Sequence, residues 1–197
     1  MVDDHALLTQ WRGGDRASGD ALFQRHFRSV RRFFKSKVGP SEAEDLIQRT
    51  FLGCVKNIAD YRGDASFRTY LFAVARNVLY MHFRSSRARP DADLDLSLHS
   101  VIDLRTGVST ELGRKDERAL VRVALRHLSV DDQTLLELSY WEGLDSAALA
   151  AVFEVSPVTI RTRRHRARQR LKKVVDELSE PGSALDLDSV TEAAGDL

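Results

Sequence analysis

DSAALAAVFEVSPVTIRTRRHRARQRLKKVV, residues 145–175, decides the fold, because a short apolar segment there passes through a tight turn into a long basic helix. Ser156 is a good N-cap for that helix, and Pro157 suits its first position, where a missing N–H leaves no hydrogen bond unmade. The segment before the turn has one apolar face, made by Leu149, Ala150, Val152 and Phe153. Together these signals predict a helix-turn-helix.

The second helix of this motif carries charge of one sign, since residues 156–175 contain eight basic and no acidic side chains. Four apolar residues recur at helical intervals and are expected to pack inward: Ile160, Ala167, Leu171 and Val174. The polar side chains of this helix are candidates for DNA contact, the N-terminal ones at base edges and the later arginines at phosphates. They are Ser156, Thr159, Arg161, Thr162, Arg163, Arg166, Arg168 and Arg170.

Two residues fit the motif less well. Glu154 stands in the turn, where glycine is easier if the backbone φ is positive. Arg164 falls on the inward line, so its stem is expected along apolar surface with its head reaching water. A basic helix that only keeps the protein soluble, or that contacts an acidic partner, is the alternative interpretation. The agreement of start signal, apolar stripe and one-sided charge favours DNA binding.

The charge of the whole chain is segregated. A chain of 197 residues can hold one or two small domains. Residues 1–89 carry sixteen basic and nine acidic side chains, whereas residues 90–155 carry six and thirteen. Because basic blocks alternate with acidic ones, two nucleic-acid-facing modules are expected although the net charge is only +1.

Nothing in the sequence indicates export or a membrane span. No apolar run approaches the roughly 18 to 20 residues that a transmembrane helix needs, and the N-terminus is too acidic for a signal peptide. The lone Cys54 excludes a disulfide framework and a cysteine-based zinc site. We therefore expect a cytoplasmic protein without membrane insertion.

Helical periodicity recurs along the chain and strand alternation does not, so the predicted fold is all-α. Residues 5–38 are expected to be helical, with an interruption at RGGD and with Asp20 capping the second run. After Gly39 and Pro40, Ser41 is expected to cap the next helix, with Glu44 in the capping-box position. That helix is predicted to have one apolar face, made by Leu46, Ile47, Phe51, Leu52, Val55 and Ile58.

The predicted organisation is two small helical domains joined by a flexible linker, with a helix-turn-helix in the second. Residues 1–84 form the first domain, which ends with a helix over residues 67–84. Residues 85–115 form the linker, because they contain turn residues and no long apolar stripe. Residues 116–179 form the second domain, and residues 180–197 are an acidic tail.

The helix predicted over residues 67–84, with the loop before it, interleaves aromatic and basic side chains. Exposed rings beside cations provide stacking platforms and phosphate contacts for unpaired bases. Large apolar rings are more often buried, so Phe67, Phe72 and Phe83 are expected in the core. The remaining candidates for DNA contact are Arg62, Arg68, Tyr70, Arg76, Asn77, Tyr80 and Arg84.

Three segments resemble a known family. AEDLIQRTF (residues 43–51), YRGDASFRTYLFAVARN (61–77) and LSYWEGLDSAALAAVFEVSPVTIRTRRHRAR (138–168) are similar to regions two and four of bacterial sigma factors of the extracytoplasmic-function (ECF) group. Two separate motifs in the right order are more specific than a helix-turn-helix alone. The resemblance covers roughly residues 5–84 and 116–175.

The resemblance implies a transcription initiation factor that recognises promoters and opens DNA locally. Its implied partners are core RNA polymerase and promoter DNA, and an anti-sigma factor is a further partner that the family allows. Asp45, Gln48 and Phe51 would bind the polymerase. The first domain would open and read the minus-ten element, and the basic helix would read the minus-thirty-five element.

Two other classes of protein compete with this interpretation. A stand-alone helix-turn-helix regulator would use the N-terminal half to sense a ligand or to dimerise. An enzyme is disfavoured, because the six histidines are scattered, form no HExxH or Cys-His set, and accompany no glycine-rich phosphate loop. We therefore expect no catalytic residues, no metal site and no cofactor.

Overall fold

The computed structural model describes residues 3–59, 61, 63–85, 96–101 and 117–179, and the regular structure within them is helical. The helices are α1 (Asp4–Arg12), α2 (Arg16–Lys35), α3 (Pro40–Asn57), α4 (Phe67–Ser85), α6 (Glu117–His127), α7 (Val130–Tyr140), α8 (Ser146–Phe153) and α9 (Pro157–Leu178). Among these residues the β-pairing is limited to an isolated bridge between Ser100 and Ser129. The prediction of an all-α fold is confirmed.

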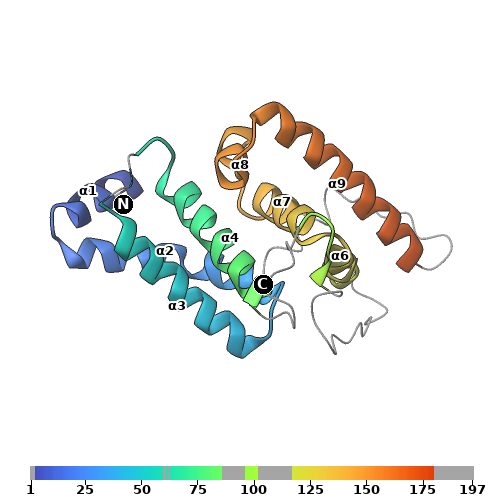
Figure 1. Ribbon diagram of the computed structural model, residues 1–197, viewed down its shortest axis with the longest axis horizontal. Helices are drawn as coiled ribbons and strands as arrows, with labels where there is room; N and C mark the ends of the chain where they lie inside the picture. The colour runs from blue at the N-terminus through green and yellow to red at the C-terminus, as the bar shows by residue number, and fades with distance from the viewer. Residues whose placement is uncertain (1–2, 60, 62, 86–95, 102–116, 180–197) are drawn as a thin grey trace.

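The helices form two units that lie side by side, α1–α4 and α6–α9 (Figure 1). In the first unit, α2, α3 and α4 pack on one another through fully buried side chains such as Leu22, Leu46 and Leu79. In the second unit, α6 and α9 pack around Leu125 and Leu171. Phe67, Phe72 and Phe83 are buried, as predicted from their size.

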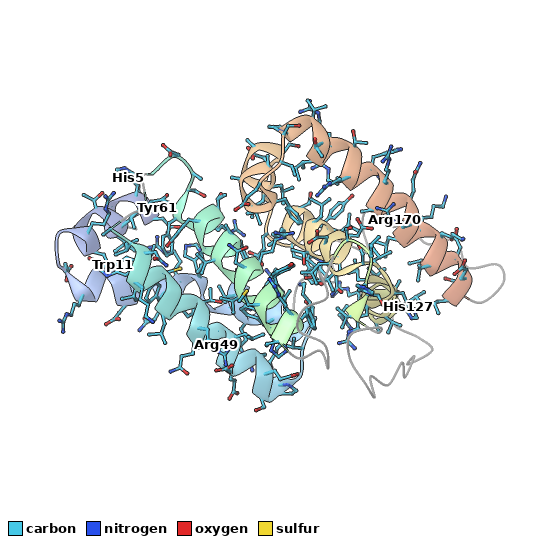
Figure 2. All side chains as sticks on the ribbon, in the orientation of Figure 1. His5, Trp11, Arg49, Tyr61, His127 and Arg170 are labelled. Atoms are coloured by element: carbon cyan, nitrogen blue, oxygen red, sulfur yellow. The ribbon has the colours of Figure 1, made fainter. Side chains whose placement is uncertain are left out.

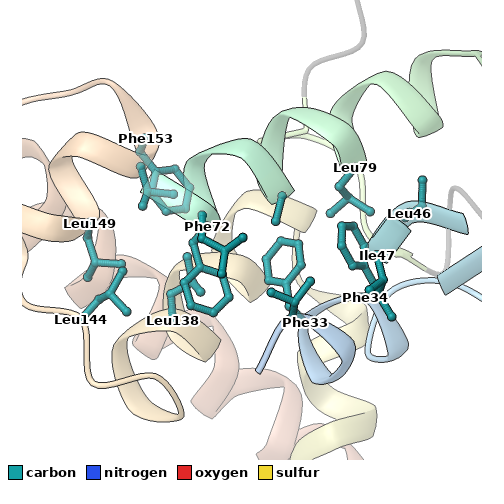
Figure 3. Packing of buried hydrophobic residues seen from close by; sticks show 14 of the residues in the cluster. Phe33, Phe34, Leu46, Ile47, Phe72, Leu79, Leu138, Leu144, Leu149 and Phe153 are labelled. Atoms are coloured by element: carbon teal, nitrogen blue, oxygen red, sulfur yellow. The ribbon is translucent and has the colours of Figure 1, made fainter. Parts of the chain in front are cut away.

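The two units share one apolar cluster. Helix α8 lies against α4, and Figure 3 shows Phe72 of α4 among Leu138, Leu149 and Phe153 of the second unit. Phe72 and Leu149 have no exposed surface, and Leu138 is nearly as buried. Because burial of large side chains is the main favourable term in folding, this contact holds the units together.

Helix starts differ from the prediction at two places. Asp15 caps α2 by accepting a hydrogen bond from the N–H of Ala17 at 3.1 Å, so Asp20 lies inside the helix. Helix α3 begins at Pro40, and Glu42 accepts a hydrogen bond from the N–H of Gly39 at 2.8 Å. Ser41 is therefore not a cap, because the fixed φ of proline starts the helix at Pro40, two residues earlier than predicted.

Residues 96–101, which lie within the predicted linker, pack against the second unit. Leu96 and Val101 are buried. The N–H of Val130 donates to the carbonyl of His99 at 2.8 Å, and that of Asp131 to Leu96 at 3.1 Å. This short segment therefore anchors the linker beside the start of α7, while residues 86–95, residues 102–116 and the tail, 180–197, lie outside the described residues.

Candidate nucleic-acid interface

The turn between α8 and α9 has the geometry of a helix-turn-helix. Asp145 caps α8 by accepting hydrogen bonds from the N–H groups of Ala147 and Ala148 at 3.0 and 2.8 Å. Helix α8 ends at Glu154, whose φ of 55° and ψ of 41° place it in the left-handed region. Ser156 then caps α9 by accepting from the N–H of Thr159 at 3.1 Å. The predicted cap is confirmed, and the turn uses a glycine-like conformation without glycine.

Helix α9 has a buried stripe and an exposed basic face. Ile160, Ala167 and Leu171 are buried as predicted, and Val175 completes the stripe beside half-buried Val174. Exposed polar residues on the other side of α9 are Arg161, Thr162, Arg163, Arg166, Arg168 and Arg170, with Ser156 exposed at the cap and Thr159 half-buried. The first turns of α9 therefore present hydroxyl and guanidinium groups in the positions from which a recognition helix reaches base edges.

Two arginines of α9 are held by neighbouring helices. Arg170, which Figure 2 labels on α9, donates from Nε and Nη2 to the two carboxylate oxygens of Asp132 at 2.6 and 2.9 Å. Arg164 is half-buried, and its Nη1 donates to Ser139 Oγ at 3.3 Å. Both contacts join α9 to α7, so they brace the recognition helix within the second unit.

The structure places the α4 candidates in two different environments. Arg68 and Arg76 lie at the contact between the units, where Arg68 donates to Glu142 at 2.6 Å and Arg76 to Asp131 at 2.9 and 3.2 Å. The Arg76 guanidinium also lies 4.7 Å from the centre of the Phe153 ring. Asn77 and Arg84 are exposed and Tyr70 and Tyr80 are half-buried, while Arg62 lies outside the described residues. The second unit thus covers part of the predicted DNA surface of α4.

Further ion pairs join the two units. Arg32 of α2 donates to Glu142 at 2.5 Å, and Lys37, which has no exposed surface, pairs with Glu137. Burial lowers the pKa of Lys37, and the Glu137 carboxylate opposes that effect. The ion pairs of Arg32, Lys37, Arg68 and Arg76 with the second unit, together with the packing of α8 on α4, define what we call the closed arrangement.

Sequence reasoning named Arg68 and Arg76 as candidates for DNA contact but missed the ion pairs between the units. Asp131 is an acid in the first turn of α7, and its pairing with α4 has no local signal in the sequence. Glu137 did have a local signal in the sequence, because it stands between Leu136 and Leu138 in a helix segment that is buried on every side. A carboxylate in such a run requires a buried cation, although nothing nearby in the sequence identifies Lys37 as that cation.

The polymerase candidates lie on the outer face of α3. Asp45 and Gln48 are exposed, and Asp45 pairs with Arg49, labelled in Figure 2, at 2.8 Å. Phe51 is half-buried and stacks on Phe27 of α2, with ring centres 6.3 Å apart. The structure adds an apolar surface that the sequence did not predict.

That apolar surface includes two side chains that were expected on the apolar face of their helix. Phe27, Leu52 and Val55 are all roughly half-exposed, although Leu52 and Val55 were assigned to the apolar face of their helix. Helix α3 has apolar residues over more than one face, and Leu46 and Ile47 occupy the buried one. Exposed apolar side chains gathered in this way are typical of a protein-binding surface.

No described helix is sufficiently long and apolar for a transmembrane segment. Among the described residues, no three His, Cys, Asp or Glu side chains are grouped so that they could hold a metal ion.

Comparison with known proteins agrees with this geometry. Residues 22–89 match the family model of Sigma-70 region 2, and residues 118–171 match that of Sigma-70, region 4. The "Probable RNA polymerase sigma-C factor" of Mycobacterium bovis is 33% identical over 175 residues, covering 86% of this chain and 91% of that protein. The "ECF RNA polymerase sigma factor SigM" of Mycobacterium tuberculosis is 28% identical, covering 89% of this chain and 86% of that protein.

The fold is also similar to solved structures. The structure of CnrH in complex with the cytosolic domain of CnrY superposes with a TM-score of 0.65 at 21% identity, covering 89% of this chain and 99% of that one. This similarity concerns the fold, while the two matched family models assign one sigma-70 region to each unit. The chain belongs to the RNA polymerase sigma factors of the sigma-70 family, in the ECF group.

Proposed function

We propose that the second domain, residues 116–179, reads the minus-thirty-five element of its promoters through α9. The exposed basic face of α9 carries this proposal, because it stands on a fully buried stripe and is braced by Asp132 and Ser139 of α7. Arg161 lies at the base-reading end, while Arg166 lies more than a turn further along. Arg163 and Arg168 supply further phosphate contacts.

The first domain, residues 1–84, binds core RNA polymerase and the minus-ten element in this proposal. Asp45, Gln48 and Phe51 contact the polymerase, and the half-exposed Phe27 and Leu52 beside them extend that surface. The residues assigned to the minus-ten element are Arg62, Arg68, Tyr70, Arg76, Asn77, Tyr80 and Arg84. The linker, residues 85–115, joins the two domains, and the tail, residues 180–197, follows the second.

The closed arrangement has to open before the first domain can read DNA, since Arg68 and Arg76 are engaged by acids of the second domain. We therefore expect that the free chain does not contact both promoter elements and that core polymerase separates the domains. RpoE of Bartonella quintana was solved in complex with the anti-sigma factor NepR. We propose an anti-sigma factor as a further partner of this chain, and we place the chain in the cytoplasm, acting without catalysis of its own.

Run-off transcription tests the proposed function. Purified chain is added to core polymerase with a set of promoters from the same genome, and specific transcripts that depend on the chain are the expected result. Arg161→Ala should reduce them, whereas Arg16→Ala, an exposed arginine of α2 outside both surfaces, should not. A chain that shifts duplex DNA sequence-specifically alone and gives no transcript with polymerase would instead be a stand-alone regulator.

A further inference from the structure

A cavity of about 330 Å³ lies between α2 of the first unit and α6 and α7 of the second. Its walls carry six cationic side chains, Arg28, Arg31, Arg32, Lys35, Arg122 and Arg126. We call it the seam cavity. No residue of α9 lines it, and it contains none of the residues assigned above to DNA or polymerase. Its volume falls within the usual range of small-molecule sites.

The charge of the seam cavity is strongly unbalanced. Among the described residues that line it, Glu137 is the single carboxylate, and Lys37 already pairs with it. Arg28, Arg31 and Lys35 are exposed and have no ion pair within the described part of the chain. Arg32 pairs with Glu142, and Arg122 and Arg126 also have partners, so the uncompensated charge lies on Arg28, Arg31 and Lys35 of α2. An anion bound in the cavity would relieve the repulsion among these three cations. Several guanidinium groups in one concave site favour phosphate, which they bind through paired N–H groups.

The uncharged side chains that line the cavity indicate a ligand with polar and aromatic groups in addition to its phosphates. The Gln133 side-chain N–H donates to Glu137 Oε1 at 2.7 Å and to the Ser36 carbonyl at 3.3 Å, and these two acceptors orient its amide. Gln133 Oε1 is then a buried acceptor with no hydrogen-bond partner among the described residues. A ligand hydroxyl or amino group would satisfy it. Trp141, half-buried in the same wall, offers an aromatic ring on which a flat base can stack.

We propose that the seam cavity binds a nucleotide with at least two phosphate groups. The phosphates contact Arg28, Arg31 and Lys35 of α2, while the base and sugar contact Trp141 and Gln133 of the second unit. Because the ligand contacts both units, it binds the closed arrangement more tightly than an open one and raises the closed fraction. The effect on promoter binding rests on the proposed function, whereas nucleotide binding does not.

Isothermal titration of the full chain with ATP and GTP, without polymerase or promoter, tests the binding site. We expect saturable binding of one nucleotide per chain. Arg31→Ala should weaken it roughly tenfold, the worth of one charge-assisted hydrogen bond. Arg16→Ala, an exposed arginine on the same helix outside the cavity, should bind as the parent does. Absence of saturable binding, or an equal loss in both variants, would overturn the proposal.

Two further titrations identify the ligand class. Tripolyphosphate should bind more weakly than ATP and GTP, and equal affinity would overturn the roles given to Trp141 and Gln133. Residues 180–197 are an acidic segment of the same chain, so an acidic peptide is the rival occupant. If nucleotide binds a chain truncated after Ser179 but not the full chain, the tail is the occupant and the nucleotide proposal is wrong.

Energy transfer between dyes on the two units measures closure directly. Lys56→Cys on α3 and Lys172→Cys on α9 provide exposed labelling sites, because the native Cys54 is fully buried. Nucleotide should raise the closed fraction in the parent chain, and ten times more nucleotide should be needed for the same rise in Arg31→Ala. Nucleotide binding that leaves the closed fraction unchanged would contradict the location of the site between the units. Failure of the proposed promoter function would leave all these outcomes unaffected.

Discussion

Glu142→Gln should open the closed arrangement. The Glu142 side chain is 4% exposed and joins two arginines of the first unit, Arg32 at 2.5 Å and Arg68 at 2.6 Å. Glutamine keeps the shape of the side chain and removes its charge. Because Glu142 is contributed by the second unit and both arginines by the first, the loss acts on the contact between units and spares the pairs within each.

The free energy lost in Glu142→Gln depends on how deeply Glu142 and its two arginine partners are buried. Removing one partner of a fully buried ion pair costs about 3 to 5 kcal/mol. The Arg32 and Arg68 side chains are 20% and 37% exposed, so water partly replaces the lost carboxylate. Glutamine also retains one acceptor oxygen. We therefore expect a loss of about 2 kcal/mol, which lowers the ratio of closed to open chains roughly thirtyfold.

The assay is energy transfer between dyes at Lys56→Cys and Lys172→Cys. Glu177→Gln is the matched control, since Glu177 pairs at 3.8 Å with exposed Lys173 on the same helix. Such exposed pairs contribute about 0.5 kcal/mol or less. A double-mutant cycle with Arg32→Gln should give a coupling free energy of at least about 1 kcal/mol. A closed fraction that is the same in Glu142→Gln and Glu177→Gln would refute the assignment of Glu142 to the contact between units.

Three other predictions concern the DNA-reading helix, its turn and the buried thiol. Arg161→Ala should relax the base preference at one promoter position by about 1 to 3 kcal/mol, whereas Arg166→Ala should weaken DNA binding equally for all sequences and lower the slope of log affinity against log salt by about one. Salt titrations on matched duplexes separate the two effects. If both variants lose affinity equally for all sequences, α9 has no base-reading end. Glu154→Gly should raise stability by about 0.5 to 1 kcal/mol, because the φ of 55° suits glycine and the exposed Glu154 side chain loses no buried contact; thermal unfolding measures it, and a lower melting temperature would contradict it. Burial raises the pKa of Cys54 from 9.0 to about 12, so its thiolate fraction at pH 8 falls about a thousandfold in the folded chain. Iodoacetamide should therefore modify Cys54 only after unfolding. Modification of the native chain at the rate of an exposed thiol would show that Cys54 is accessible.

The sequence by itself determined the features that depend on neighbouring residues. Ser156 and Pro157 mark the start of α9, and the recurrence of Ile160 and Leu171 identifies its buried stripe, because a cap and a helical period act within a few residues. The segregation of charge along the chain likewise identified the basic helix. Two motifs in order were sufficient to predict the family, since each motif is local.

Tertiary structure alone decided which charged side chains are free to meet a partner. Lys37 and Glu137 are 100 residues apart in the chain, and Arg32 and Glu142 are 110 apart. Pairing over such separations depends on how the two units pack, and no periodicity or cap encodes it. The same packing places Arg76, predicted on a DNA surface, against Asp131, because the apolar contact of α4 with α8 brings the start of α7 beside it. The type and spacing of side chains in the sequence predict what they can bind. Whether a side chain is accessible depends on how the two units pack, and the chain joins these units only through a linker.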